Sequence, residues 1–107
     1  MNSIHWIYLI AAGFFEIGWP LGLKLASIPS FKIFGPIISI ISMGISGVLL
    51  WLSLKGISIG TAYAVWTGIG AAGTFIIGVI FFNDPSIILR WIGVSLIILG
   101  VIFLKVA

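Results

Sequence analysis

The chain lacks cysteine and carries very little charge. Its 107 residues include 5 Lys and Arg, 2 Asp and Glu, and 1 His. The absence of cysteine excludes disulfides and thiolate metal sites. The charged fraction of 7% lies far below the roughly 25% of average soluble proteins. The basic residues are scattered singly, so the chain has no basic stripe for binding nucleic acid. No nucleophile, metal cluster or phosphate loop is recognisable, and we expect no enzyme activity, no cofactor and no metal.

The composition is instead dominated by apolar residues. Hydrophobic residues make up 62% of the chain, and the mean hydropathy is +1.39. Crossing a ~30 Å hydrocarbon core takes about 20 helical residues, and the apolar residues form runs of about this length at 4–23, 33–54, 57–82 and 86–104. The first run has neither a basic N-terminal region nor an A-x-A cleavage site, which favours a retained helix over a signal peptide. The sequence therefore predicts an all-α membrane protein, with a single four-helix transmembrane domain over 1–107.

The basic residues give almost no preference for one membrane orientation. Four spans place Lys55 and Lys105 on one side of the bilayer and Lys24, Lys32 and Arg90 on the other. Cytoplasmic loops normally hold an excess of Lys and Arg. A chain with so small a difference can insert in both orientations, and two inverted copies can pair as an antiparallel homodimer.

The size of the chain and the spacing of its glycines also favour a homodimer. Four helices can pack into a bundle, but they leave little room for a solute path unless a second copy supplies the other wall. Gly93 and Gly100 are seven residues apart and therefore lie on one face of the fourth run. Small residues at such spacing let helices approach closely, which predicts a dimer contact. Glycine is also common in membrane helices generally, so that alternative stays open.

Glu16 is the strongest functional candidate. It lies about twelve residues into the first run, near mid-bilayer at a ~1.5 Å rise per residue. An ionised carboxylate there costs several kcal/mol unless it meets a wet cavity or a cation. No basic residue lies within one helical turn. We interpret Glu16 as a cation and proton site; the alternative is a glutamate satisfied by another helix.

The helical neighbours of Glu16 fit a cation site. Ala12 and Gly13 leave space, and Trp19 offers an indole N–H and a π face. Pro20 cannot donate to the carbonyl of Glu16, which frees that carbonyl or kinks the helix. Gly13 and Pro20 are therefore predicted to line the cavity.

Aromatic and hydroxyl groups in the other runs are further candidates. Tyr63 and Trp66 share a face of the third run, where they can hydrogen-bond Glu16 and flank a cation, although aromatic residues at this spacing often serve packing. A glycine series follows, and Gly68 and Gly70 are its predicted hinge. The second run contains several serines, each inert if it bonds its own helix. Ser46, near mid-span, is the best candidate to reach Glu16.

The remaining polar residues have structural interpretations. Asp84 before Pro85 is typical of a helix N-cap followed by proline at the first helical position. His5 beside Trp6 favours interfacial anchoring over a proton relay. The positions Lys24, Lys32, Lys55 and Arg90 are expected to extend to headgroups.

These features together resemble the small multidrug resistance transporters over essentially the whole chain. The most specific stretch runs from Ile59 to Gly70 and reads IGTAYAVWTGIG. It is reinforced by Gly13-x-x-Glu16, by Leu23-Lys24, by Phe81-Phe82 and by the Gly93 and Gly100 pair. The resemblance implies a dual-topology homodimer in the bacterial inner membrane that exchanges small organic cations for protons.

The resemblance also suggests a subtype and a site. Trp19 and Lys105 are similar to the guanidinium-exporting branch, whereas Pro20, usually alanine, and a first loop two residues longer depart from it. The implied binding residues are Glu16, Trp19, Ser46, Tyr63 and Trp66. Alternatives are a quaternary-ammonium or multidrug exporter, a subunit of a lipid-headgroup or polyamine transporter, and a purely structural membrane module.

Overall fold

A computed structural model describes residues 3–107, so residues 1 and 2 of the predicted domain lie outside the described part. It contains four α-helices: α1 (Ser3–Leu25), α2 (Phe34–Ser53), α3 (Ile59–Phe81) and α4 (Ile88–Val106), with a short 3-10 turn, η1 (Pro29–Phe31), between α1 and α2. All four are long and apolar enough to cross a membrane. Each end lies within two residues of the predicted run. Over residues 3–107 the chain is an all-α, four-span membrane protein.

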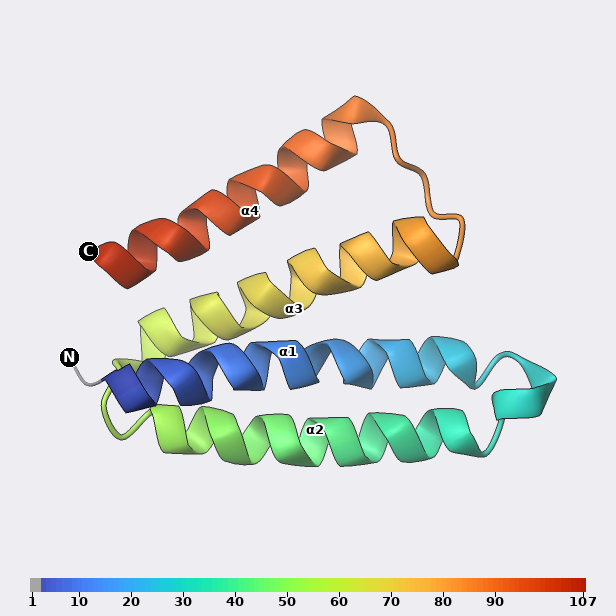
Figure 1. Cartoon of the computed structure of the whole chain (residues 1–107), viewed down its shortest axis with the longest axis horizontal. Helices are drawn as coiled ribbons and strands as arrows, with labels where there is room; N and C mark the ends of the chain where they lie inside the picture. Colours follow the sequence, from blue (N-terminus) through green and yellow to red (C-terminus); the bar gives the residue numbers. More distant parts are fainter. Residues whose placement is uncertain (1–2) are drawn as a thin grey trace.

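The helices form a flat layer rather than a closed bundle. The molecule measures 45 × 33 × 17 Å, and the order of helices across the layer is α2, α1, α3, α4 (Figure 1). Helix α4 packs mainly against α3 and leans away from it toward the α3–α4 loop. In a layer 17 Å thick, the buried side chains lie at the contacts between adjacent helices. Both broad faces of the protomer are therefore left uncovered by the chain itself.

Small residues join α1 to α2. A side chain at Gly22 or Gly35 would overlap the backbone of the opposite segment, so the two backbones touch. The Ser39 hydroxyl donates to the carbonyl of Trp19 at 2.7 Å. Close backbone approach and interhelical hydrogen bonds are the main sources of attraction between helices in lipid. The α1–α2 contact is therefore the tightest seam of the protomer.

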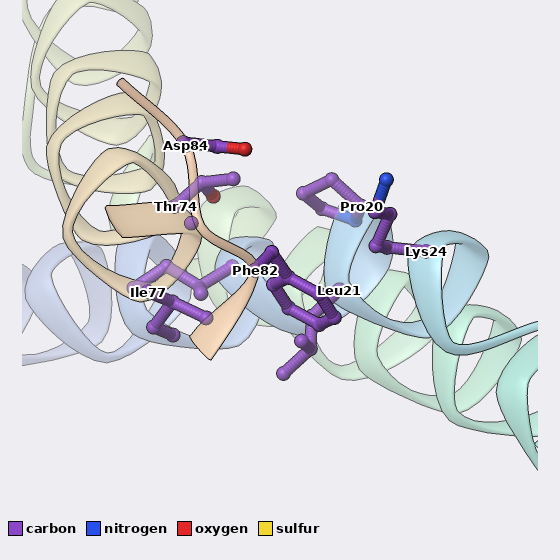
Figure 2. A pocket seen from close by; sticks show the side chains of 9 residues that line it. Pro20, Leu21, Lys24, Thr74, Ile77, Phe82 and Asp84 are labelled. Atoms are coloured by element: carbon purple, nitrogen blue, oxygen red, sulfur yellow. The ribbon is translucent and has the colours of Figure 1, made fainter. Parts of the chain in front are cut away.

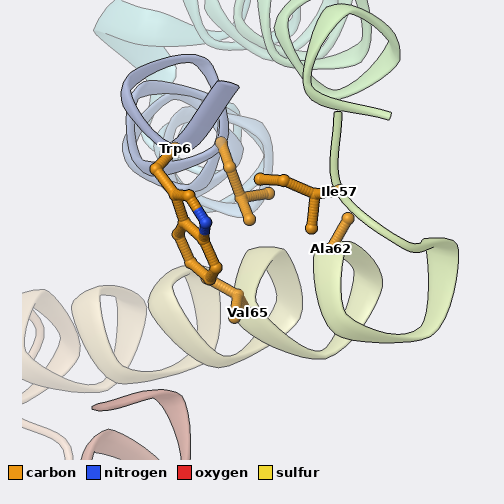
Figure 3. Packing of buried hydrophobic residues seen from close by; sticks show 5 residues of the cluster. Trp6, Ile57, Ala62 and Val65 are labelled. Atoms are coloured by element: carbon orange, nitrogen blue, oxygen red, sulfur yellow. The ribbon is translucent and has the colours of Figure 1, made fainter. Parts of the chain in front are cut away.

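Apolar packing closes one end of the α1–α3 contact. Trp6 is 4% exposed and lies between the two helices, near Ile57, Ala62 and Val65 (Figure 3). The cluster sits at the end of the layer that holds the start of α1, the end of α4 and the α2–α3 loop (Figure 1). Toward the other end, apolar packing gives way to the polar groups described below.

The prediction that Asp84 caps α4 is wrong. Helix α4 begins at Ile88, its N-cap residue is Ile87, and no side chain caps it. Asn83 takes a left-handed conformation with φ 57°, and the Asp84 N–H donates to the carbonyl of Gly78 at 3.1 Å. Asparagine tolerates this conformation, which commonly ends a helix. Asp84 therefore belongs to the C-terminal end of α3, and the chain runs extended from there to Ile87.

Candidate functional site

Glu16 points from α1 toward α3 and lies against Gly70. A Cβ atom at position 70 would overlap the Glu16 carboxylate, so the absent side chain provides its space. Among residues 3–107, no hydrogen bond or ion pair involves the Glu16 side chain. The carboxylate is thus placed near mid-helix with its acceptor capacity unused.

An open groove of about 420 Å³ surrounds this carboxylate. Its wall includes Trp19 and Pro20 from α1, Thr67 and Thr74 from α3, and Asp84 from the loop after α3. Trp19 is 37% exposed, so part of the indole faces the open space. Of the predicted residues, the structure brings Glu16, Trp19, Pro20 and Gly70 into one groove. Helix α1 continues through Pro20 as a single element.

Ser46 and Trp66 meet each other rather than Glu16. The Ser46 hydroxyl is fully buried; it donates to the Ala12 carbonyl at 2.6 Å and accepts from the Trp66 indole N–H at 2.8 Å. This network links α1, α2 and α3 one turn before Glu16. The predicted contact from Ser46 to Glu16 is not formed within the described protomer, because Glu16 turns toward Gly70, a full turn beyond Trp66.

Tyr63 stands at the edge of the same region. Its ring centre lies 5.6 Å from that of Trp66, with the planes inclined by 49°. The side chain is 57% exposed, and the Thr67 hydroxyl donates to the Tyr63 carbonyl. The Tyr63 ring therefore packs against Trp66 on one side, and the rest of its surface is exposed.

Some of the predicted glycines pack against another helix of the protomer, whereas others have open space beside them. Gly13 accommodates Ile69, and Gly68 accommodates Val101 of α4, while Gly70 accommodates Glu16. Helix α3 is unbroken across Gly68 and Gly70, and their hinge role stays a prediction. A Cβ at Gly93 or Gly100 would meet nothing within 4 Å. That face of α4 is free to receive another helix.

Sequence reasoning missed Thr67, Thr74 and Asp84 as groove residues. A helical count along α3 was the available signal, since positions 67, 70, 74 and 78 recur every three or four residues and so share a face. Asp84 gave no such signal, because its place depends on the turn at Asn83. Within 3–107 no group of three His, Cys, Asp or Glu side chains is placed to hold a metal ion.

Four membrane-length helices with a carboxylate groove at mid-depth define a small polytopic membrane protein. Comparison with known proteins then gives the family. The profile described as Small Multidrug Resistance protein matches residues 4–97. The chain belongs to this family, and it is a multi-pass protein of the bacterial inner membrane.

Curated relatives cover nearly the whole chain. A protein of Proteus vulgaris named guanidinium exporter is 45% identical over 97% of this chain and 99% of its own length. Guanidinium exporters of Yersinia pestis and of Escherichia coli K12 are 42% and 40% identical, over 95% and 97% of this chain and 97% and 98% of their own lengths. These relatives are exporters, which indicates a transporter rather than an enzyme.

Proposed function

We propose that this protein is a proton-coupled antiporter that exports guanidinium or substituted guanidinium ions in exchange for protons. The observation that carries the proposal is Glu16, a membrane-embedded carboxylate in an open groove with no partner among residues 3–107. Such a group favours either a proton or a cation as its occupant. Similarity to relatives named guanidinium exporters supports the choice of cation.

The groove offers the chemistry that a guanidinium ion needs. This ion is planar and carries several N–H donors, so it can bond a carboxylate in a two-pronged geometry. The half-exposed Trp19 indole beside Glu16 offers a ring face that attracts a cation. Because protons and the guanidinium ion use the same carboxylate, binding of one displaces the other. That exclusion couples export to proton return.

A second, inverted copy completes the proposed transporter. The protomer is a single layer, and the Gly93 and Gly100 face of α4 is uncovered. The near-equal distribution of basic residues between the two membrane sides permits both orientations. In such an antiparallel pair two Glu16 carboxylates share one cavity, and their mutual repulsion favours proton uptake when no cation is present.

The Ser46–Trp66 bond has a positioning role in this proposal. It fixes the indole of Trp66, which in turn contacts the exposed ring of Tyr63. Two aromatic rings are thereby held at the margin of the cavity that the partner copy closes. They flank the cation while Glu16 binds it.

Currents from proteoliposomes on a solid-supported membrane test the proposal. Wild-type protein should give currents with guanidinium, and weaker ones with a tetraalkylammonium ion that lacks N–H donors. Acidification should raise the apparent KM for guanidinium, since protons compete for the same site. Glu16→Gln, similar in size and always neutral, should abolish the current. The absence of a guanidinium current with the wild-type protein, or normal exchange by Glu16→Gln, would overturn the proposal.

A further inference from the structure

Asp84 is held in place against the end of α3. Its backbone N–H bonds the Gly78 carbonyl at 3.1 Å, and its carboxylate fills the space that a side chain at Gly78 would take. No described basic side chain forms an ion pair with it. Asp84 is thus a fixed carboxylate with open acceptor sites, in the loop just beyond the membrane-spanning part of α3.

Glu16 and Asp84 lie along one face of α3. Glu16 lies against Gly70 and Asp84 against Gly78, and these positions are eight residues apart, or about 12 Å at the helical rise. Thr74 lies halfway between them on the same face. All three line the groove that contains Glu16. The groove therefore continues from mid-membrane to the surface on the α3–α4 loop side.

Thr74 has a hydroxyl with no internal partner. Its oxygen is buried and unbonded among the described residues. Hydroxyls in membrane helices ordinarily bond the carbonyl of the preceding turn, as Thr67 does with Tyr63. A buried hydroxyl without such a bond is costly unless a ligand or water satisfies it. Because the Thr74 side chain lines the groove, rotation about its Cα–Cβ bond would present this unpaired hydroxyl to an occupant.

A second cavity, of about 180 Å³, opens beside these residues. Thr74 and Asp84 line it together with Pro20, Lys24 and Phe82 (Figure 2). The Lys24 ammonium lies 5.9 Å from the centre of the Phe82 ring, so this ring already faces a cation. A carboxylate, an aromatic ring and a hydroxyl thus lie together here, as Glu16, Trp19 and Thr67 do in the groove.

We propose that Asp84, Thr74 and Phe82 form an outer binding station where a guanidinium-type cation is held between the membrane surface and Glu16. The inference rests on the proposed export function. When the station is empty, the Lys24 ammonium covers Phe82; an arriving cation takes this place, and the flexible lysine turns to the lipid headgroups. In an antiparallel pair, one Asp84 lies at each membrane surface. The cation then meets an equivalent station on either side.

The test is guanidinium transport by an Asp84→Asn variant, measured across guanidinium concentrations in the proteoliposome assay. Loss of an exposed charge-assisted contact should raise the apparent KM roughly threefold to fivefold and leave the maximal rate unchanged. The difference should shrink at high ionic strength, because salt screens exposed charges. Thr74→Val should also raise the apparent KM, and Thr74→Ser should restore it.

The matched control moves the carboxylate by one position. The double variant Asn83→Asp/Asp84→Asn keeps composition and net charge, and aspartate tolerates the left-handed conformation at 83. It should behave like Asp84→Asn. An unchanged KM for Asp84→Asn, or a wild-type KM for the double variant, would overturn the proposal of an outer binding station. Neither result would affect the proposed export function. A wild type that moves no guanidinium would overturn both.

Discussion

The buried hydrogen bond between Ser46 and Trp66 allows a quantitative prediction about stability. Ser46→Ala removes the hydroxyl that accepts the Trp66 indole N–H at 2.8 Å. The Ala12 carbonyl keeps its helical partner, but the indole N–H loses its acceptor in a site where Ser46 is fully buried. Leaving a buried donor unpaired costs about 1–3 kcal/mol in general. Bonds between membrane helices average only ~0.6 and reach ~1.7 kcal/mol.

We therefore expect Ser46→Ala to lower the free energy of unfolding by about 1–2 kcal/mol. Trp66→Phe removes the same bond from the other side and leaves Ser46 its bond to Ala12. If the two side chains interact as the structure has them, the double variant should lose about 1 kcal/mol less than the sum of the single losses.

Denaturant titration of the purified protein in lipid–detergent micelles measures these free energies. Ser53→Ala is the matched control, because Ser53 is equally buried but bonds Leu50 of its own helix. The Leu50 carbonyl keeps the Leu54 N–H, so the control should lose less than about 0.5 kcal/mol. A coupling between positions 46 and 66 below about 0.3 kcal/mol would refute the reasoning.

Two further predictions concern glycines. Gly70→Ala should reduce guanidinium exchange in the proteoliposome assay about tenfold or more, because the added methyl group displaces the Glu16 carboxylate. Gly44 faces open space, so the control variant Gly44→Ala should transport normally. Wild-type exchange by Gly70→Ala would contradict the placement of Glu16 against Gly70. Gly100→Leu should abolish crosslinking between inverted copies in membranes, because Gly100 lies on the proposed dimer face. Gly47→Leu is the control and should leave crosslinking intact, since a side chain at either position would contact nothing within its own protomer but Gly47 lies outside that face. Unimpaired crosslinking of Gly100→Leu would show that the copies pair through another surface.

The helices were predictable because membrane spans follow from length and hydropathy alone. Glu16 was equally visible, since a lone carboxylate in an apolar run stands out without any knowledge of packing. Its proximity to Trp19 and Pro20 followed from helical spacing within one element. These features are local in sequence.

The rest depended on how the helices are placed in space. Nothing in the pattern indicated that α1 lies between α2 and α3, or that the protomer is a flat layer. Ser46 was expected at Glu16 because both lie at mid-span, but depth does not determine which face a side chain occupies. Asp84 was assigned to the wrong helix because the sequence Asp-Pro is typical of a helix start, whereas the turn at Asn83 and the hydrogen bond to Gly78 decide its position.

The seam between α1 and α2 has a consequence for how the protein is made. The glycines and serines that form it all lie before Ser53, so this hairpin can assemble while the second half of the chain is still being synthesised. At that stage Glu16 is already in the bilayer, and Gly70, which later provides its space, has not yet been added. The apolar residues of the first two helices must therefore offset the insertion of a carboxylate by several kcal/mol on their own. We therefore expect the strongly apolar α2 to favour membrane insertion of this hairpin as well as the finished fold.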